Sequence, residues 1–288
     1  MPCHIQTGEY LLRIVLLVAH SPNGESQHRY VAKKLADEFP DELAAIIVAT
    51  GVDRSPMERA KRWWRRYTVR QLASRVLARA YRKFTNADFH RQYTYREVLF
   101  PEGDNGEMPR SDLVQRVPSH NGSECLEIIG DLDPDVVAVY GTLIIGKKVI
   151  AASKRMINIH TGFSPEYRGS DTIFWSLHNS EPHYVGVTVH RVDAGVDSGP
   201  ILARGRPEIR STDGENRLFA KAVRLGAELM CRAIRREMDA SSRPMPQDLR
   251  RGREYRAVDR TLAAELRVRK LLNNGLLLEE CDEWSEEF

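Results

Sequence analysis

One stretch decides the fold, and it has four parts: INIH (157–160), PEYRG (165–169), GVTVH (186–190) and VDAGVDSGP (192–200). Asn158 and His160 are two residues apart, so on an extended segment both side chains point to the same side. Asp197 lies in a loop punctuated by glycine, where a side chain can be presented at low steric cost. These three polar residues are therefore candidates for handling a proton or a carbonyl oxygen at strand ends.

The overall composition is that of an ordinary soluble globular protein. The chain has 288 residues, of which 42% are hydrophobic and 29% charged, which suits one large domain or one domain with appendages. The net charge of +3 is too small to indicate a nucleic-acid partner by itself.

Cysteine usage and the first apolar run indicate the compartment. Four cysteines lie far apart and without paired metal-ligand spacing: Cys3, Cys125, Cys231 and Cys281. This pattern favours reduced thiols and a cytoplasmic location. The apolar run at 11–19 contains Arg13 and is too short to span a bilayer, so we predict no transmembrane segment.

The first elements open an α/β fold. A continuous apolar run at 12–19 predicts a buried strand, a helix is expected over 26–39, and a second strand over 44–48. Further elements are expected as strands over 136–140, 156–160 and 201–203 and as helices over 123–132 and 260–272. A capping-box pattern at Thr212-x-x-Glu215 is expected to open another helix that runs to about 238. The loop at 101–122 is rich in proline and glycine.

These elements predict an open, mostly parallel Rossmann-like sheet with helices on both faces. We expect a catalytic domain over 10–240 with a helical insertion at about 55–84. A C-terminal extension over 241–288, partly helical, is expected to leave the core, and its acidic end is expected to be mobile.

The insertion at 55–84 is strongly basic. It holds ten lysines and arginines against one acid, Glu58, and its apolar residues recur at a helical period. One interpretation is a long amphipathic helix with a solvated basic face. The other is a surface for an anionic partner, namely a phosphorylated substrate, a nucleic acid or an acidic membrane. The acidic C-terminal tail could also dock there.

The ordered motifs of the central stretch resemble the family of formyltransferases that use 10-formyltetrahydrofolate. That family includes glycinamide ribonucleotide, methionyl-tRNA and sugar-nucleotide formyltransferases, and formyltetrahydrofolate hydrolase. The matching segments are NIH (158–160), SP-x-YRG (164–169), GVTVH-x-V (186–192) and D-x-GP (197–200). A weaker likeness extends over most of 12–239. The resemblance implies a formyltransferase-like Rossmann fold.

The resemblance also implies roles for particular residues. It makes Asn158, His160 and Asp197 the catalytic trio. The folate-binding walls would comprise Leu143, Ile144, Ile145, Val192, Asp193, Ala194, Gly195 and Val196. Substrate would contact Asn23, Gly24 and Arg168. The formyl donor would be 10-formyltetrahydrofolate, and no metal would be needed.

The chemistry of formyl transfer fits these residue types. An amine attacks a formamide-like carbonyl, and negative charge develops on its oxygen. Donors from Asn158 and His160 aimed at that oxygen are typically worth about 2.7–4 kcal/mol each. The carboxylate of Asp197 would take the proton lost by the attacking nitrogen.

Each of the three residues also has a structural interpretation. Asn158 could cap a strand end, His160 could serve as a structural hydrogen-bonding group, and Asp197 could be an ordinary turn aspartate. Three further residues of the stretch are interpreted as packing or surface residues: Trp175, His178 and His190.

The function expected from the resemblance is an N-formyltransferase acting on the amine of a small metabolite, such as an amino sugar nucleotide, an ornithine-like side chain or another biosynthetic intermediate. The 20–24 loop departs from the glycine-rich pattern of the purine enzymes, and residues 240–288 lack the patterning of a β domain. The alternatives are a 10-formyltetrahydrofolate hydrolase and a non-catalytic relative that binds folate or nucleic acid, the latter through the basic insertion.

Overall fold

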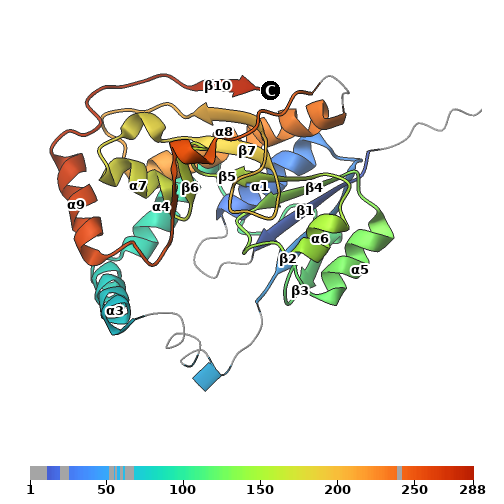
Figure 1. The fold of residues 1–288 in the computed structure, drawn as a ribbon, viewed down its shortest axis with the longest axis horizontal. Helices are drawn as coiled ribbons and strands as arrows, with labels where there is room; N and C mark the ends of the chain where they lie inside the picture. The colour runs from blue at the N-terminus through green and yellow to red at the C-terminus, as the bar shows by residue number, and fades with distance from the viewer. Residues whose placement is uncertain are drawn as a thin grey trace, which may run out of the picture.

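The computed structural model describes residues 12–19, 26–51, 55, 57, 58, 61, 68–238 and 242–288 (Figure 1). Within them, an eight-stranded sheet has the order β10-β8-β7-β5-β4-β1-β2-β3. Its parallel part comprises β1 (Ile14–Ala19), β2 (Leu43–Ala49), β3 (Val114–Val117), β4 (Val136–Tyr140) and β5 (Met156–His160). Its antiparallel part comprises β7 (Val187–Arg191), β8 (Ile201–Arg206) and β10 (Trp284–Glu287).

Strand β1 shows why both faces of the sheet are covered. Its side chains alternate between two apolar cores: Ile14, Leu16 and Val18 face one core, and Val15 and Leu17 face the other. The first core packs under α1 (Ser26–Glu38), α4 (Ala87–Leu99) and α8 (Glu215–Met238). The second packs under α5 (Ser123–Leu132) and α6 (Lys147–Ala151). The predicted open α/β fold, mostly parallel at its centre, is confirmed.

The remaining elements lie around this sheet. Two short strands, β6 (Tyr167–Gly169) and β9 (Arg253–Tyr255), pair in parallel outside it. The other helices are α3 (Val69–Phe84), α7 (Thr172–His178) and α9 (Leu262–Asn273), with 3-10 turns at Ser111–Leu113, Pro182–Tyr184 and Leu249–Arg251. The helix expected at 260–272 is therefore confirmed, whereas helix α4 and strand β3 were not predicted. Strand β3 lies in the region expected to be a loop.

The C-terminal extension packs on the domain, so the prediction that it leaves the core is wrong. Strand β10 pairs with β8 and forms the edge of the large sheet (Figure 1). Strand β9 pairs with β6 beside the central stretch. Neither strand has a long alternating apolar pattern, because each has only three or four residues and lies at an edge.

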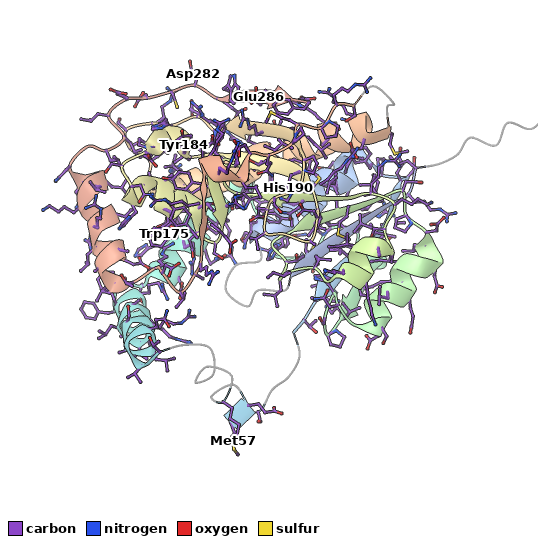
Figure 2. All side chains as sticks on the ribbon, viewed as in Figure 1. Met57, Trp175, Tyr184, His190, Asp282 and Glu286 are labelled. Atoms are coloured by element: carbon purple, nitrogen blue, oxygen red, sulfur yellow. The ribbon has the colours of Figure 1, made fainter. Side chains whose placement is uncertain are left out.

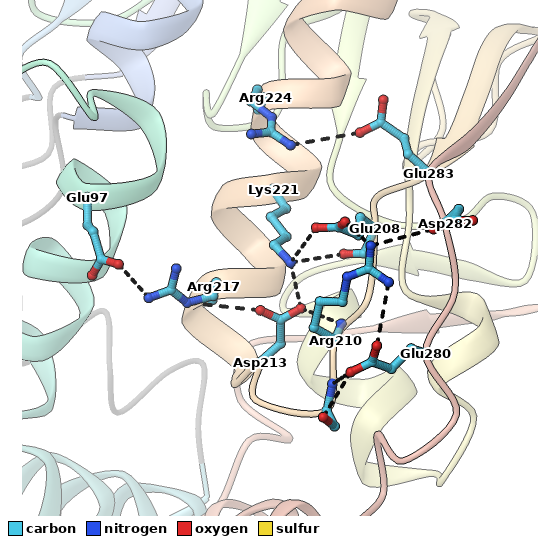
Figure 3. A network of polar contacts seen from close by, with 11 residues as sticks. Glu97, Glu208, Arg210, Asp213, Arg217, Lys221, Arg224, Glu280, Asp282 and Glu283 are labelled. Carbon is cyan, nitrogen blue, oxygen red and sulfur yellow. Dashed lines mark hydrogen bonds and ion pairs between the residues drawn. The ribbon is translucent and has the colours of Figure 1, made fainter.

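Among the described residues, the acidic tail is held by arginines of the main domain. Glu280 accepts hydrogen bonds from Ser211 and lies 3.5 Å from Arg210, and Glu283 lies 4.0 Å from Arg224 of α8 (Figure 3). The suggestion that this tail docks on the 55–84 helix is therefore wrong for these carboxylates. Among the described residues, no helix is both long and apolar enough to cross a membrane.

Candidate active site

The pairing of β5 with β7 brings two polar side chains together. In this antiparallel register Asn158 lies opposite His190, and Asn158 Nδ2 is 3.2 Å from His190 Nε2. His160, two residues further along β5, is buried on the same side of the strand. His190 is also buried, so its interpretation as a packing or surface residue missed its contact with the predicted site.

Asp197 joins the two histidines. Its Oδ2 lies 3.3 Å from His160 Nδ1, and its Oδ1 lies 3.4 Å from His190 Nε2. The backbone N–H of Gly169 donates a third contact to Oδ2 at 3.0 Å. Asp197 has a positive φ of 48°, a left-handed conformation that aspartate tolerates better than most residues. The three predicted catalytic residues thus form one network, in which His190 connects Asn158 to Asp197.

The hydrogen bonds fix where the two imidazoles carry protons. His160 Nε2 lies 2.9 Å from the carbonyl oxygen of Tyr167, which can only accept, so this nitrogen donates. His190 Nδ1 lies 2.8 Å from the carbonyl oxygen of Arg191 and donates for the same reason. The other nitrogen of each ring lies near Asp197, and Nε2 of His190 also lies near the Asn158 amide nitrogen, which donates.

The Asp197 carboxylate is held in its charged form. Burial by itself would raise the pKa of Asp197, but the neighbouring His160 and the hydrogen bonds from His190 and Gly169 outweigh burial. The net effect holds the pKa of this carboxyl well below its ordinary value of 3.8. Asp197 can therefore act as a proton acceptor throughout the neutral pH range.

The C-terminal extension holds the loop that carries Asp197. Gln247 Nε2 donates to the carbonyl oxygens of Asp197 at 3.0 Å and of Gly199 at 2.6 Å. Arg251 pairs with the buried Glu166 at 2.6 Å. A Cβ added at Gly252 would lie 1.9 Å from the carbonyl oxygen of Pro165, so only glycine permits this approach. Residues 247–252 therefore fix two segments of the site from outside.

Tyr255 completes this attachment with an aromatic stack. Its ring lies between Trp175, with centroids 5.1 Å apart and planes at 14°, and Tyr167, with centroids 5.3 Å apart and planes at 8°. Asn179 donates to the hydroxyls of both tyrosines. Trp175 lies on α7 on the side of the molecule away from α5 and α6 (Figure 2). It is a packing residue, as expected, and its partner comes from the extension.

The residues predicted to bind folate lie in two loops, and both loops are held by the same apolar cluster. Leu143 and Ile144 are 86% and 77% exposed, in the loop that follows the carboxyl end of β4. Ile145 and Val192, in contrast, pack into the apolar cluster beneath α6. Apolar side chains left in solvent at the carboxyl end of a parallel strand are suited to a flat aromatic ligand.

Each of these loops is stiffened by a polar side chain. Asn121 donates to the carbonyl oxygen of Ile144 and accepts from the N–H of Gly146. Asp193 Oδ1 accepts from Gly195 N at 3.0 Å and from Ser198 Oγ at 2.7 Å. Asp193 therefore holds its own turn, whereas Asp197 faces the histidines.

Of the three residues predicted to contact substrate, the structure describes one. Arg168 lies on β6, beside the Gly169 N–H that binds Asp197, and its Nε is buried without a hydrogen-bond partner within the described ranges. Asn23 and Gly24 lie outside the described residues. In the part of the chain that the structure describes, no group of three or more His, Cys, Asp or Glu side chains is placed to hold a metal ion.

Comparison with known proteins shows what the central part of the chain resembles. The Formyl transferase family model matches residues 109–234, a range that contains Asn158, His160, His190 and Asp197. Methionyl-tRNA formyltransferase of Kosmotoga olearia is 32% identical over 132 residues, which are 45% of this chain and 42% of that protein. The chain thus spans less than half the length of this curated relative.

Two solved structures share the fold. A sugar N-formyltransferase from a Shewanella species superposes with a TM-score of 0.54 at 15% identity, covering 90% of this chain and 87% of that one. A 4-N formyltransferase from Francisella tularensis gives a TM-score of 0.53 at 14% identity, covering 86% and 78%. At this identity the likeness shows the fold alone. The family match adds a likeness to formyl transferases over residues 109–234.

Proposed function

We propose that the protein is an N-formyltransferase that moves a formyl group from 10-formyltetrahydrofolate to an amine of a small metabolite. The observation that carries the proposal is the position of Asp197, which contacts both His160 and His190 inside the region matched by the family. A buried carboxylate kept ionised beside two imidazoles is in the form that can accept a proton from an attacking amine.

The donor would bind along the two loops. Leu143 and Ile144 would contact one face of its pterin ring, and residues 193–195 would border the other side, since both loops are anchored through Ile145 and Val192. The donor supplies the formyl carbon. Its carbonyl would lie at the end of β5, where Asn158 and His160 point to the same side of the strand.

The protein groups would then divide the chemistry. As the amine nitrogen bonds to the formyl carbon, the carbonyl oxygen gains charge that the Asn158 amide and the His160 imidazole stabilise. Asp197 takes the proton of the amine, and it or His160 returns a proton to the nitrogen that leaves. Because both nitrogens of His160 contact protein oxygens in this structure, one contact must be exchanged when substrate binds.

Two features support a small acceptor. Arg168 carries a buried Nε that no described residue satisfies, and it lies next to the Gly169 amide that holds Asp197. A guanidinium in this position suits a phosphate or carboxylate on the acceptor. An amino sugar nucleotide or an ornithine-like amine carries such a group. The cytoplasmic location remains part of the proposal.

The test is to incubate the purified full chain with 10-formyltetrahydrofolate and a panel of primary amines, following release of tetrahydrofolate. The panel includes amino sugar nucleotides and amino acids with side-chain amines. Release that depends on one class of amine supports the proposal. Equal release without any amine would identify a hydrolase, and no release together with no binding of a folate analogue would reject both.

A further inference from the structure

Helix α3 turns its apolar side away from the protein. It begins at a capping box in which Thr68 and Gln71 satisfy each other's backbone N–H groups. Its inner side buries Ala78 and makes polar contacts with α9: Arg82 lies 3.1 Å from Glu265, and Tyr81 accepts a hydrogen bond from Arg269. Because charged and polar groups hold the helix to α9, its apolar residues are free to face outward.

The outward face is a continuous row that we call the apolar stripe, consisting of Val69, Ala73, Val76, Leu77, Ala80 and Phe84. The spacing of 69, 73, 76 and 80 alternates between four and three residues, which keeps them on one side of a helix. All six are exposed, and Phe84 is 89%, Val76 63% and Leu77 58% exposed. An exposed row of large apolar side chains is unusual on a free surface.

The charge beside the apolar stripe has one sign. Residues 69–84 contain arginines and a lysine but no aspartate or glutamate. Arg79 and Lys83 are exposed and form no ion pair with a residue that the structure describes. They lie four residues apart, on the same flank of the stripe. The outward half of α3 therefore combines apolar side chains with positive charge.

This combination selects among the possible partners. A second copy of the chain, packed stripe to stripe, would bring Arg79 and Lys83 near their own counterparts, which costs free energy. A nucleic acid would satisfy the charges but leave the apolar stripe in water. An anionic bilayer satisfies both, since acyl chains take the stripe and head groups take the flanking cations.

We propose that α3 is a docking surface for an anionic lipid bilayer. The helix lies in the plane of the interface, with the apolar stripe at the head-group and acyl boundary. Figure 1 shows α3 at the periphery of the molecule, next to α9 and away from the large sheet, so the helix can meet a flat surface. It also lies outside residues 109–234, the range that the family model matches.

The chain continues this surface into the next helix. Phe89 and Tyr93 of α4 are also large, exposed side chains, and they are four residues apart on one side of that helix. They follow Phe84 closely in sequence.

The test measures co-sedimentation of the full chain with vesicles of phosphatidylcholine alone or mixed with phosphatidylglycerol. The wild type should sediment with the mixed vesicles and be released by salt. Arg79→Gln/Lys83→Gln should lower the partition coefficient about 25-fold, at about a factor of five for each basic residue. Leu77→Ser/Phe84→Ser should also lower binding. Leu278→Ser, which alters an equally exposed apolar residue elsewhere, should bind like the wild type.

Several results would overturn the proposal. If the wild type binds neither kind of vesicle, or binds both equally, docking on an anionic surface is contradicted. A dimer in light scattering that Leu77→Ser/Phe84→Ser converts to monomer would make the stripe a self-association surface. Binding to duplex RNA that only the charge variant abolishes, without vesicle binding, would make it a nucleic-acid surface. Thermal unfolding of each variant shows that its fold is retained.

Discussion

Asn158 and His190 face each other across the antiparallel pair β5–β7, with Asn158 Nδ2 3.2 Å from His190 Nε2. The same ring nitrogen of His190 lies 3.4 Å from Asp197. His190 therefore links two residues that are 39 positions apart in the sequence. It is the central member of the proposed site, although it lies outside the trio that the family resemblance implies.

Replacing His190 tests this link. His190→Phe keeps a ring of similar size but removes the nitrogen between Asn158 and Asp197. Displacing catalytic groups by about 1 Å can lower kcat about 100-fold, and we expect an effect of this order with little change in KM. His178→Phe is the matched control, because His178 contacts Asn179 and the aromatic rings of α7. Equal kcat values for the two variants would show that His190 only packs in the core and does not link Asn158 to Asp197.

The extension should act on the site through Gln247. Gln247→Ala removes two hydrogen bonds to the carbonyl oxygens of the loop that carries Asp197. We expect a loss of about 1–2 kcal/mol in the free energy of unfolding and a lower kcat, measured by urea unfolding and steady-state kinetics. Arg250→Ala, at an exposed position three residues along, should leave both unchanged. If Gln247→Ala lowers stability but leaves kcat unaltered, the extension does not act on the active site.

The close packing around Gly252 leads to a second prediction, which concerns the stability that the extension contributes. A Cβ there would meet backbone atoms of Pro165 and Glu166, which cannot move aside as a flexible side chain can. Gly252→Ala should therefore lower the free energy of unfolding by about 1–3 kcal/mol. Gly130→Ala is the control: it lies in α5 with open space around its added Cβ, and it should be neutral or slightly stabilising. The idea fails if the two variants unfold at the same denaturant concentration.

The depressed pKa of Asp197 predicts how stability depends on pH. The unfolded chain protonates this carboxyl near its ordinary value of 3.8, and the folded protein does so only at lower pH. Asp197 thus contributes stability above that value, and this contribution is lost as the pH falls below it. Urea unfolding from about pH 6 to about pH 3 should show a steeper acid loss for wild type than for Asp197→Asn. Parallel curves would contradict the assignment.

The centre of the large sheet could be predicted because its strands there are buried on both faces. The runs at 14–18, 44–48 and 136–140 are apolar on both sides, so the sequence reveals them without any long-range information. Helix α8 could be predicted for a related reason, since one long amphipathic pattern extends to Met238.

The role of His190 could not be predicted in this way. It depends on the antiparallel register between β5 and β7, and a strand shifted by one residue would turn the ring to the other face. The position of the extension depends on equally distant contacts. Tyr255 finds its stacking partners about 80 positions earlier, and β9 has only three residues to indicate a strand.

The partners of the acidic tail could not be predicted from charge alone. Composition suggested that the tail could dock on the most basic segment of the chain, residues 55–84. In the structure, Glu286 and Glu287 bind arginines of β8 and α8 instead, because β10 pairs with β8 and carries them there. A charge pattern in the sequence indicates which side chains can form ion pairs. The pairing of the strands decides which opposite charges lie close enough to form them.

The central claim is that Asp197 accepts the proton in formyl transfer. The most direct measurement compares amine-dependent release of tetrahydrofolate by wild type, Asp197→Asn and Asp193→Asn. We predict that Asp197→Asn lowers kcat by about 10²–10⁴-fold, the usual contribution of a general base. Asp193→Asn should change the KM for the donor more than kcat, since that side chain holds the turn beside the proposed pterin site and does not face the histidines. Equal rates for Asp197→Asn and wild type would contradict the account.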